Sequence, residues 1–266
     1  MEYIIKPTRV IGNASGVILP KEWKNSLIRA EIITKPLNEY ELLKLIENEI
    51  SIKKIMGIYL IGSYARGDYD NKSDIDILVI NKDINKTMKL GKYEINILSL
   101  SSLEYLLKYN CIPVLPWIVE SVSIINDSLL DKYKNTKLTL KNLKWHIETN
   151  KTSMNIIREK LKAAKKYDDY EYICGCSYSL VLRLRTLYAI ECLIKKKIQR
   201  KSELISLIEK ISGSRNIYDI YLDNKLNIDE DIKDVEKVSY EGIKSILDYI
   251  VIKNKEIEKW LKEKKD

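Results

Sequence analysis

The chain has little cysteine and no long apolar run. Its four cysteines, at positions 111, 174, 176 and 192, form no C-x-x-C pair, so the sequence lacks the spacing of a zinc ribbon or a thioredoxin-like redox motif. No signal peptide or membrane-length apolar segment opens the chain. We therefore expect a reduced, cytoplasmic protein that makes no use of a membrane.

Acidic charge is also in deficit. Lys and Arg number 46 against 38 Asp and Glu among 266 residues, which gives a formal net charge of +8. A moderate basic excess favours anionic partners such as nucleotides or nucleic acid, without selecting between them. A chain of this length holds one large domain or about two to three small ones.

One polar segment stands between two apolar runs. Residues 55–61 and 75–80 are typical of buried strands, and the segment between them begins with Gly62-Ser63 and ends at Asp74 and Asp76. Because side chains alternate across a strand, Asp74 and Asp76 are expected on one face and Ile75 on the other. Gly62 allows a phosphate to approach the backbone closely, and Ser63 adds a hydroxyl and an amide.

The two aspartates need a positive partner. Carboxylates one pleat apart repel each other unless a cation lies between them. Oxygen ligands without a nearby cysteine or histidine suit Mg²⁺ better than zinc. We interpret residues 55–80 as one hairpin. A phosphate at its Gly-Ser end and a metal at its two aspartates describe a site for a nucleoside triphosphate. The alternative is a polar surface hairpin that carries two aspartates by chance.

The segment GSYARGDYDNKSDIDILVI, with ten residues between Gly-Ser and Asp-x-Asp, resembles the signature of the polymerase-β-like nucleotidyltransferases. It is closest to their minimal and aminoglycoside-type members. The resemblance implies in-line transfer of a nucleoside monophosphate, AMP from ATP in the first instance, to an acceptor hydroxyl. It implies that Asp74 and Asp76 hold two Mg²⁺ ions. The nucleotide-binding residues that it implies are Gly62, Ser63, Arg66 and Ser73.

The same family carries a third carboxylate on a further strand, where it helps to take the proton from the attacking hydroxyl. Residues 92–98 are typical of that strand, and the family pattern puts Asn96 where the acid is expected. An amide cannot act as a base. Three alternatives stay open: Glu94, one pleat away, is the catalytic acid; the base comes from the C-terminal part; or catalysis is impaired.

Residues 1–36 are typical of short strands and turns. We expect strands at 3–5, 9–11, 17–19 and 29–33, with a turn at 12–16. The stretch RVIGNASGVILPKEWKNSLIRAEII resembles the swapped-hairpin AbrB-like family, in which two chains interlace strands and often bind DNA. The resemblance implies either duplex DNA contacts or a structural, dimerising hairpin. The candidate DNA contacts are Lys6, Arg9, Lys21 and Lys24.

The middle of the chain alternates between helix and strand. We expect helices at 37–52 and 100–109, a loop at 81–89 and a strand at 117–125, in which Glu120 is an edge-strand charge or faces the site.

The C-terminal half is predicted to be helical, with helices at 140–166, 172–197, 202–211 and 229–264 that form a bundle. Its arrangement is similar to the HEPN-like domains that accompany this transferase type. HEPN ribonucleases use an Arg followed closely by His, whereas His146, the only histidine, lacks such an Arg, so ribonuclease activity is not expected. Three residues of the bundle are candidates for contacts with an anionic nucleotide or with the catalytic domain, or else form an ion-paired helix face: Arg183, Arg185 and Tyr188.

The predicted fold class is α+β, with a small mixed sheet. We expect a β-hairpin module at 1–36, a nucleotidyltransferase domain at 37–130 and a helical bundle at 131–266. The predicted function is metal-dependent transfer of AMP to an unknown hydroxyl on a small molecule or a partner protein. The competing hypotheses are a DNA-binding regulator with a degenerate, nucleotide-sensing transferase domain, and a toxin-neutralising partner without turnover. The base preference and the oligomeric state, a homodimer included, stay open.

Overall fold

The computed structural model describes residues 9–28, 39–70, 73–167, 170–226 and 238–264, and the chain forms two compact units, Met1–Pro36 and Leu37–Asp266. In the first unit, β1 (Arg9–Ile11) and β2 (Ala14–Gly16) form an antiparallel hairpin, followed by the single 3-10 turn η1 (Lys21–Trp23). The predicted strand at 17–19 is wrong, because strand pairing ends at Gly16. The strands expected at 3–5 and 29–33 lie outside the described residues.

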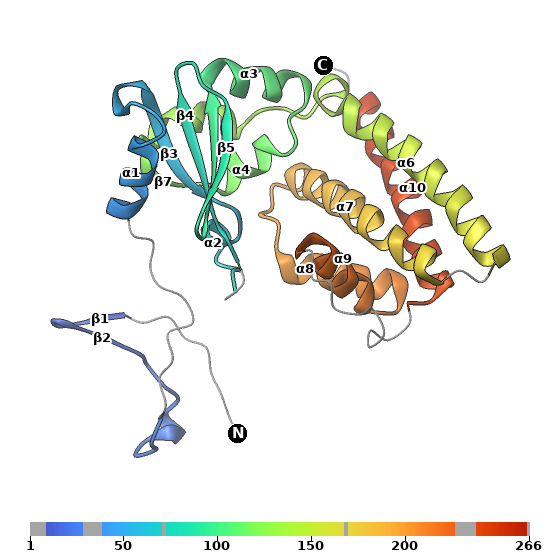
Figure 1. The fold of residues 1–266 in the computed structure, drawn as a ribbon, viewed down its shortest axis with the longest axis horizontal. Helices are drawn as coiled ribbons and strands as arrows, with labels where there is room; N and C mark the ends of the chain where they lie inside the picture. Colours follow the sequence, from blue (N-terminus) through green and yellow to red (C-terminus); the bar gives the residue numbers. More distant parts are fainter. Residues whose placement is uncertain (1–8, 29–38, 71–72, 168–169, 227–237, 265–266) are drawn as a thin grey trace. The chain divides into compact units, whose positions relative to one another are not determined.

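The second unit is built on a five-stranded mixed sheet in the order β5-β6-β4-β3-β7 (Figure 1). β4 and β6 run parallel, and the other neighbouring strands are antiparallel. This confirms the predicted α+β class. The loop expected at 81–89 is wrong at its end, since β5 pairs with β6 as an edge strand. The strands are β3 (Ile55–Ile61), β4 (Ile75–Asn81), β5 (Lys86–Leu90), β6 (Tyr93–Ser99) and β7 (Val122–Ile125).

Each face of the sheet is covered by helices. Ile75 and Ile77 are fully buried with α1 (Glu39–Glu47), which precedes the short η2 turn (Ile52–Lys54). Leu78 and Ile80 point to the other face, into a core shared with α3 (Leu100–Tyr109) and α4 (Val114–Glu120). Burying each such side chain contributes about 1.5–3 kcal/mol, and a slip of one residue would reverse every face. The register of β4 is thereby determined, and with it the face that carries Asp76.

The segment 117–125 is only partly the strand that we predicted. Residues 117–120 belong to α4, and β7 starts at Val122. Proline is tolerated in the first turn of a helix, so Pro116 does not interrupt α4, while Val114 and Ile118 enter the core. α5 (Asp127–Lys134), which we did not predict, follows β7. Glu120 is therefore the last residue of a helix rather than an edge-strand charge.

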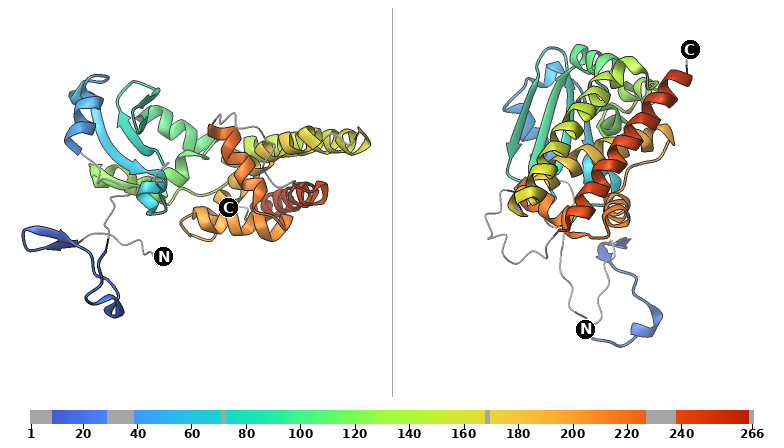
Figure 2. Two further views of the ribbon diagram at one scale, coloured as in Figure 1. Left: turned by 60° about the horizontal axis from the view of Figure 1, so that its bottom comes forward. Right: turned by 90° about the vertical axis from the view of Figure 1, so that its right-hand side faces the viewer.

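The C-terminal half is a helical bundle in which α10 packs against α6, α7 and α8 (Figure 2). None of the helices in the described parts of the chain has the length and apolar character needed to span a membrane. One core runs from the sheet into the bundle, so the boundary at 130/131 stays a prediction. The helices are α6 (Leu140–Tyr167), α7 (Tyr170–Ile194), α8 (Lys201–Ser212), α9 (Asn216–Leu226) and α10 (Tyr240–Glu263).

The bundle contains one helix that was not predicted, and its last helix starts later than predicted. α9 was not predicted, and the last helix starts at Tyr240, with residues 229–237 of the expected helix outside the described residues. His146 is buried at the junction of α6 with the loop before α4, where its Nε2 lies 3.0 Å from the carbonyl oxygen of Ile112.

Candidate functional site

The two aspartates lie at the start of β4. Asp76 is the second residue of the strand and Asp74 directly precedes it, while Ile75 between them is fully buried on the opposite face. The parallel register pairs Asp76 with Glu94 and Leu78 with Asn96. Because register partners on adjacent strands leave the sheet on the same face, the structure places the side chains of Asp76 and Glu94 on one face at one end of the sheet.

Asn96 has a local partner of its own. Its Oδ1 accepts a hydrogen bond of 3.0 Å from Oγ1 of Thr87 on β5, and only 9% of the residue is exposed. Asn96 therefore lies one pleat further into the sheet than Glu94. Among the residues that the structure describes, Glu94 makes no recorded hydrogen bond or ion pair, and it is half-buried.

Gly62 forms the bend between β3 and the short helix α2 (Gly62–Arg66). Its φ of +70° lies in the left-handed region that favours glycine. A Cβ at this position would overlap the carboxylate of Asp76, so the absence of a side chain lets the two segments touch. The Gly62 amide donates a hydrogen bond of 3.0 Å to Oε1 of Glu120. The Gly62 amide at the bend is thus bound to a carboxylate of the chain itself.

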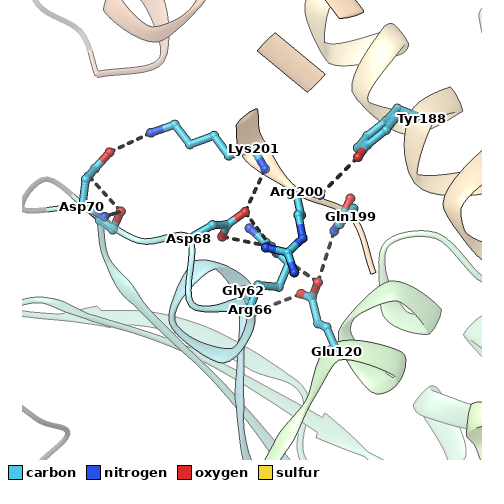
Figure 3. Close-up of polar contacts among 10 residues, drawn as sticks. Gly62, Arg66, Asp68, Asp70, Glu120, Tyr188, Gln199, Arg200 and Lys201 are labelled. Atoms are coloured by element: carbon cyan, nitrogen blue, oxygen red, sulfur yellow. Dashed lines mark hydrogen bonds and ion pairs between the residues drawn. The ribbon is translucent and has the colours of Figure 1, made fainter. Parts of the chain in front are cut away.

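Arg66, at the end of α2, is held by two acids. Its Nη1 lies 3.0 Å from Oε2 of Glu120, and its Nε lies 3.1 Å from Oδ1 of Asp68 (Figure 3). Burial lowers the pKa of Arg66, but the charges and hydrogen bonds of Glu120 and Asp68 outweigh it and raise the pKa above its ordinary value. The predicted role of Arg66 in neutralising phosphates stays a prediction, and its present partners are carboxylates.

The two serines of the motif take different places. Ser63 is half-buried within α2. Ser73 closes a turn with Asp70: its Oγ donates to Oδ1 of Asp70 and accepts from the Asp70 amide, both at 2.9 Å. Between them, the rings of Tyr64 and Tyr69 stack with centroids 4.2 Å apart. The described residues of the hairpin are therefore held by contacts with one another, and Ser73 holds the turn at Asp70.

Contacts from the helical bundle reach the same hairpin (Figure 3). Nε2 of Gln199 donates to Oε2 of Glu120 at 3.3 Å. The Lys201 amide donates to Oδ2 of Asp68 at 2.8 Å, and Lys201 Nζ pairs with Asp70 at 2.7 Å. From the sequence we expected Glu120 on a strand, either as an edge charge or facing the site, and we predicted no role for Gln199 or Lys201. The motif carries no local signal for these partners, since 58 residues separate Gly62 from Glu120.

The three bundle residues that the sequence offered as nucleotide contacts are hydrogen-bonded within the bundle. Nη1 of Arg183 donates to Thr149 at 3.1 Å, and Arg185 approaches the Tyr221 hydroxyl at 3.5 Å. Tyr188 donates to Glu203 at 2.9 Å and accepts from the Arg200 amide at 3.2 Å. Tyr188 thus supports the start of α8.

The carboxylates fit Mg²⁺ by ligand type. Within the described residues, no three His, Cys, Asp or Glu side chains are already gathered as a metal site. Asp74 is paired instead with Lys89 at 3.1 Å, and Lys89 is 61% exposed. Such exposed pairs contribute only about 0–1 kcal/mol, so a divalent ion can displace the lysine. Mg²⁺ is commonly held by one or two carboxylates plus substrate phosphates and water. Asp74 and Asp76 are the two carboxylates that the chain would contribute to such a set of ligands.

Short curated relatives are similar to a part of the chain. The protein named "Putative protein adenylyltransferase MJ0141" of Methanocaldococcus jannaschii is 41% identical over 68 residues, covering 24% of this chain and 68% of the relative. A second protein of that organism with the same description is 47% identical over 47 residues, covering 16% of this chain and 47% of the relative. The chain thus spans about half the length of that second relative.

Two solved structures overlap loosely with the chain. A nucleotidyltransferase-like protein from Exiguobacterium sibiricum has a TM-score of 0.36 and 15% identity, with 86% of this chain and 81% of that one covered. A spectinomycin adenyltransferase from Enterococcus faecialis, solved with ATP and spectinomycin, has a TM-score of 0.41 and 15% identity, with 82% and 100% covered.

The family comparison spans most of the chain. The family described as "Nucleotidyltransferase domain" matches residues 42–211, a range that includes the sheet, the Gly-Ser bend, both aspartates and the bundle up to α8. This chain belongs to the nucleotidyltransferase domain family and is a nucleotidyltransferase enzyme.

Proposed function

We propose that the enzyme transfers AMP from ATP to a hydroxyl group on a protein, with Mg²⁺ bound at Asp74 and Asp76. The observation that carries the proposal is the contact of Gly62 with Asp76, which brings the Gly-Ser bend directly against the paired carboxylates. The relatives named as protein adenylyltransferases favour a protein acceptor. A small-molecule hydroxyl is the alternative acceptor.

The reaction forms one bond and breaks one. The acceptor oxygen attacks the α-phosphorus of ATP, the bond from that phosphorus to the bridging oxygen of the β-phosphate breaks, and pyrophosphate leaves. Glu94 takes the proton of the attacking hydroxyl, and Gly62 and Ser63 position the β- and γ-phosphates. Bound Mg²⁺ supplies charge neutralisation on the phosphate oxygens. Base selection is assigned to none of the described residues of the hairpin, so ATP as the donor is proposed from the names of the relatives.

A labelling experiment tests this proposal. The chain is incubated with Mg²⁺, ATP labelled at the α-phosphate, and protein fractions as acceptors. We expect label on a protein band, and its loss in the Asp74→Ala/Asp76→Ala variant. Asp83→Ala is the matched control, because Asp83 pairs with Lys54 on the surface. Labelling that persists in the double variant would refute the assigned metal ligands.

DNA binding by the first unit is a separate proposal. It is supported by the β1–β2 hairpin and by the exposed side chains of Lys21 and Lys24. Arg9 begins β1, and Lys6 lies outside the described residues. The full chain is expected to bind duplex DNA with an affinity that falls steeply with salt, and Lys21→Ala/Lys24→Ala should weaken it. Salt-independent or absent binding would leave the hairpin as a dimerisation element, which the mass of the assembly in solution would show.

A further inference from the structure

Glu120 is a buried carboxylate with three donors, two at the ends of α2 and one in the connection between α7 and α8. Only 3% of its side chain is exposed. It accepts from the Gly62 amide at 3.0 Å, from Arg66 Nη1 at 3.0 Å and from Gln199 Nε2 at 3.3 Å. A buried charge is costly unless it is paired and hydrogen-bonded. These contacts satisfy Glu120 and tie together the bend, α2 and the connection between α7 and α8 (Figure 3).

Gly62 is constrained on two sides. Its amide is bound by Glu120, and its Cα packs against the carboxylate of Asp76. Any shift of Glu120 therefore moves the bend relative to Asp76. In reactions that depend on positioned groups, a displacement of about 1 Å can cost roughly 100-fold in rate. The position of Glu120 therefore matters for the reaction although Glu120 need not touch the nucleotide.

The connection between α7 and α8, residues 195–200, leads directly to a second contact. At the first residue of α8, the Lys201 amide binds Asp68, which also accepts from Arg66. Gln199 and Lys201 thus contact the two acids that hold Arg66. One short segment of the bundle, residues 199–201, thus makes both contacts: Gln199 binds Glu120 at the end of α4, and Lys201 binds Asp68 in the hairpin.

We propose that Glu120 is a positioning residue for the nucleotide-binding bend, and that the helical bundle stabilises it through Gln199. The inference rests on the proposed function, since it takes Gly62 and Ser63 as the part that binds the triphosphate. The bundle then contributes to the binding of ATP as well as to the stability of the fold. The opposing interpretation is that the Glu120 carboxylate competes with phosphate for the Gly62 amide, in which case its removal would strengthen ATP binding.

Mg²⁺-ATP binding distinguishes the two interpretations. We expect Glu120→Gln to weaken binding by about 10- to 100-fold, because it replaces charge-assisted hydrogen bonds with neutral ones. Gln199→Ala should weaken it by about three- to tenfold, with an unchanged melting temperature, since Gln199 is only half-buried. Glu258→Gln is the matched control: Glu258 pairs with Lys151 and Lys262 within the bundle. Its loss should leave ATP binding unchanged.

The two effects should be coupled. In Glu120→Gln, the added Gln199→Ala is expected to cost less than it does alone, because the two side chains share one hydrogen bond. A purely structural role would instead lower the melting temperature of every variant and give additive effects. Unchanged ATP affinity in both single variants, or a gain in affinity for Glu120→Gln, would overturn the proposal.

Amide hydrogen exchange at Gly62–Arg66 provides a readout without nucleotide. Both Glu120→Gln and Gln199→Ala are expected to accelerate exchange in this segment relative to Glu258→Gln, whether or not ATP binds. Unchanged exchange would refute the positioning role. If the wild-type chain binds no Mg²⁺-ATP, or if Asp74→Ala/Asp76→Ala leaves binding intact, then the proposed function fails, and the exchange result still decides the inference.

Discussion

Asp76 and Glu94 are register partners on the parallel strands β4 and β6, so their side chains leave the same face of the sheet. Asn96, where the family pattern puts the third acid, pairs instead with Leu78 and accepts a hydrogen bond from Thr87. The strand register thus favours Glu94 among the three alternatives for the third carboxylate.

Glu94→Gln is the direct test of that role. The substitution keeps the size of the side chain and removes the base, so we expect the rate of AMP transfer to fall by about 10²- to 10⁴-fold. Asn96→Asp should bring no gain, because position 96 lies beside Leu78 rather than Asp76. Initial rates with α-labelled ATP measure both. A variant Glu94→Gln with the wild-type rate would place the base elsewhere, in the C-terminal part for instance.

Gly62→Ala should damage both stability and function. Alanine at a φ of +70° is strained by about 1–2 kcal/mol, and its Cβ would collide with the carboxylate of Asp76. Gly91→Ala is the control, since Gly91 has a φ of +58° but nothing within 4 Å of an added Cβ. We expect Gly91→Ala to lose about 1 kcal/mol in urea unfolding and to bind Mg²⁺-ATP normally.

The result for Gly62→Ala should differ in kind. Its loss of unfolding free energy should exceed that of Gly91→Ala, and its ATP affinity should fall by about tenfold or more, because the bend can no longer contact Asp76. Equal losses in the two variants, with ATP affinity intact, would show that only the backbone strain at Gly62 matters.

The sequence was sufficient for features that depend on local pattern. The strands around the hairpin follow from the apolar runs 55–61 and 75–80, and the helix at 100–109 is confirmed as α3. Residues 117–120 of α4 were predicted as part of a strand because Ile118 and Val119 favour that structure, whereas tertiary packing of Val114 and Ile118 selects the helix. β5 was missed because its polar residues gain strand structure only by pairing with β6.

The residues of the candidate site also differ in whether the sequence predicts them. The motif revealed Gly62 and Asp76, but the partner that holds Gly62 lies far along the chain. Glu120 ends a helix, and Gln199, the only glutamine, lies in a connection between helices. Neither residue belongs to a periodic pattern or a recognisable motif. Only the three-dimensional contacts, of Glu120 with Gly62 and Arg66 and of Gln199 with Glu120, distinguish the two residues from others on their elements.

Lys89→Ala should strengthen Mg²⁺ binding. Lys89 pairs with Asp74 across an exposed contact, with side chains 61% and 38% exposed, so its removal should change the unfolding free energy by less than about 0.5 kcal/mol. The apparent Mg²⁺ affinity, measured by titration at fixed ATP, should rise by about two- to fivefold, because a competing cation is gone. Lys86→Ala, which breaks an exposed pair with Glu49, is the control. Equal Mg²⁺ affinities in both variants would argue against Asp74 as a ligand.

His146 makes stability sensitive to mild acid. Burial lowers the pKa of His146, the nearby charge of Arg183 acts in the same direction, and the hydrogen bond to Ile112 only partly opposes them. The folded protein therefore binds the proton less readily than the unfolded chain, whose histidine titrates near pH 6.5. The stabilisation is fully present above about pH 6.5 and decreases as the pH falls below it, with a slope of at most about 1.4 kcal/mol per pH unit for one proton.

Urea unfolding at pH 7.5, 6.5 and 5.5 measures this dependence. His146→Gln should flatten the profile over this range, because glutamine does not titrate and its Nε2 is able to donate to the carbonyl oxygen of Ile112. Carboxylates contribute equally to both proteins, so the difference between the two profiles isolates the histidine. Since the chain has one histidine, a single imidazole resonance reports its titration directly. Two results would contradict a neutral His146 buried where α6 packs against Ile112. One is a resonance that titrates at or above pH 6.5 in the folded protein, and the other is the same dependence of unfolding free energy on pH in both proteins.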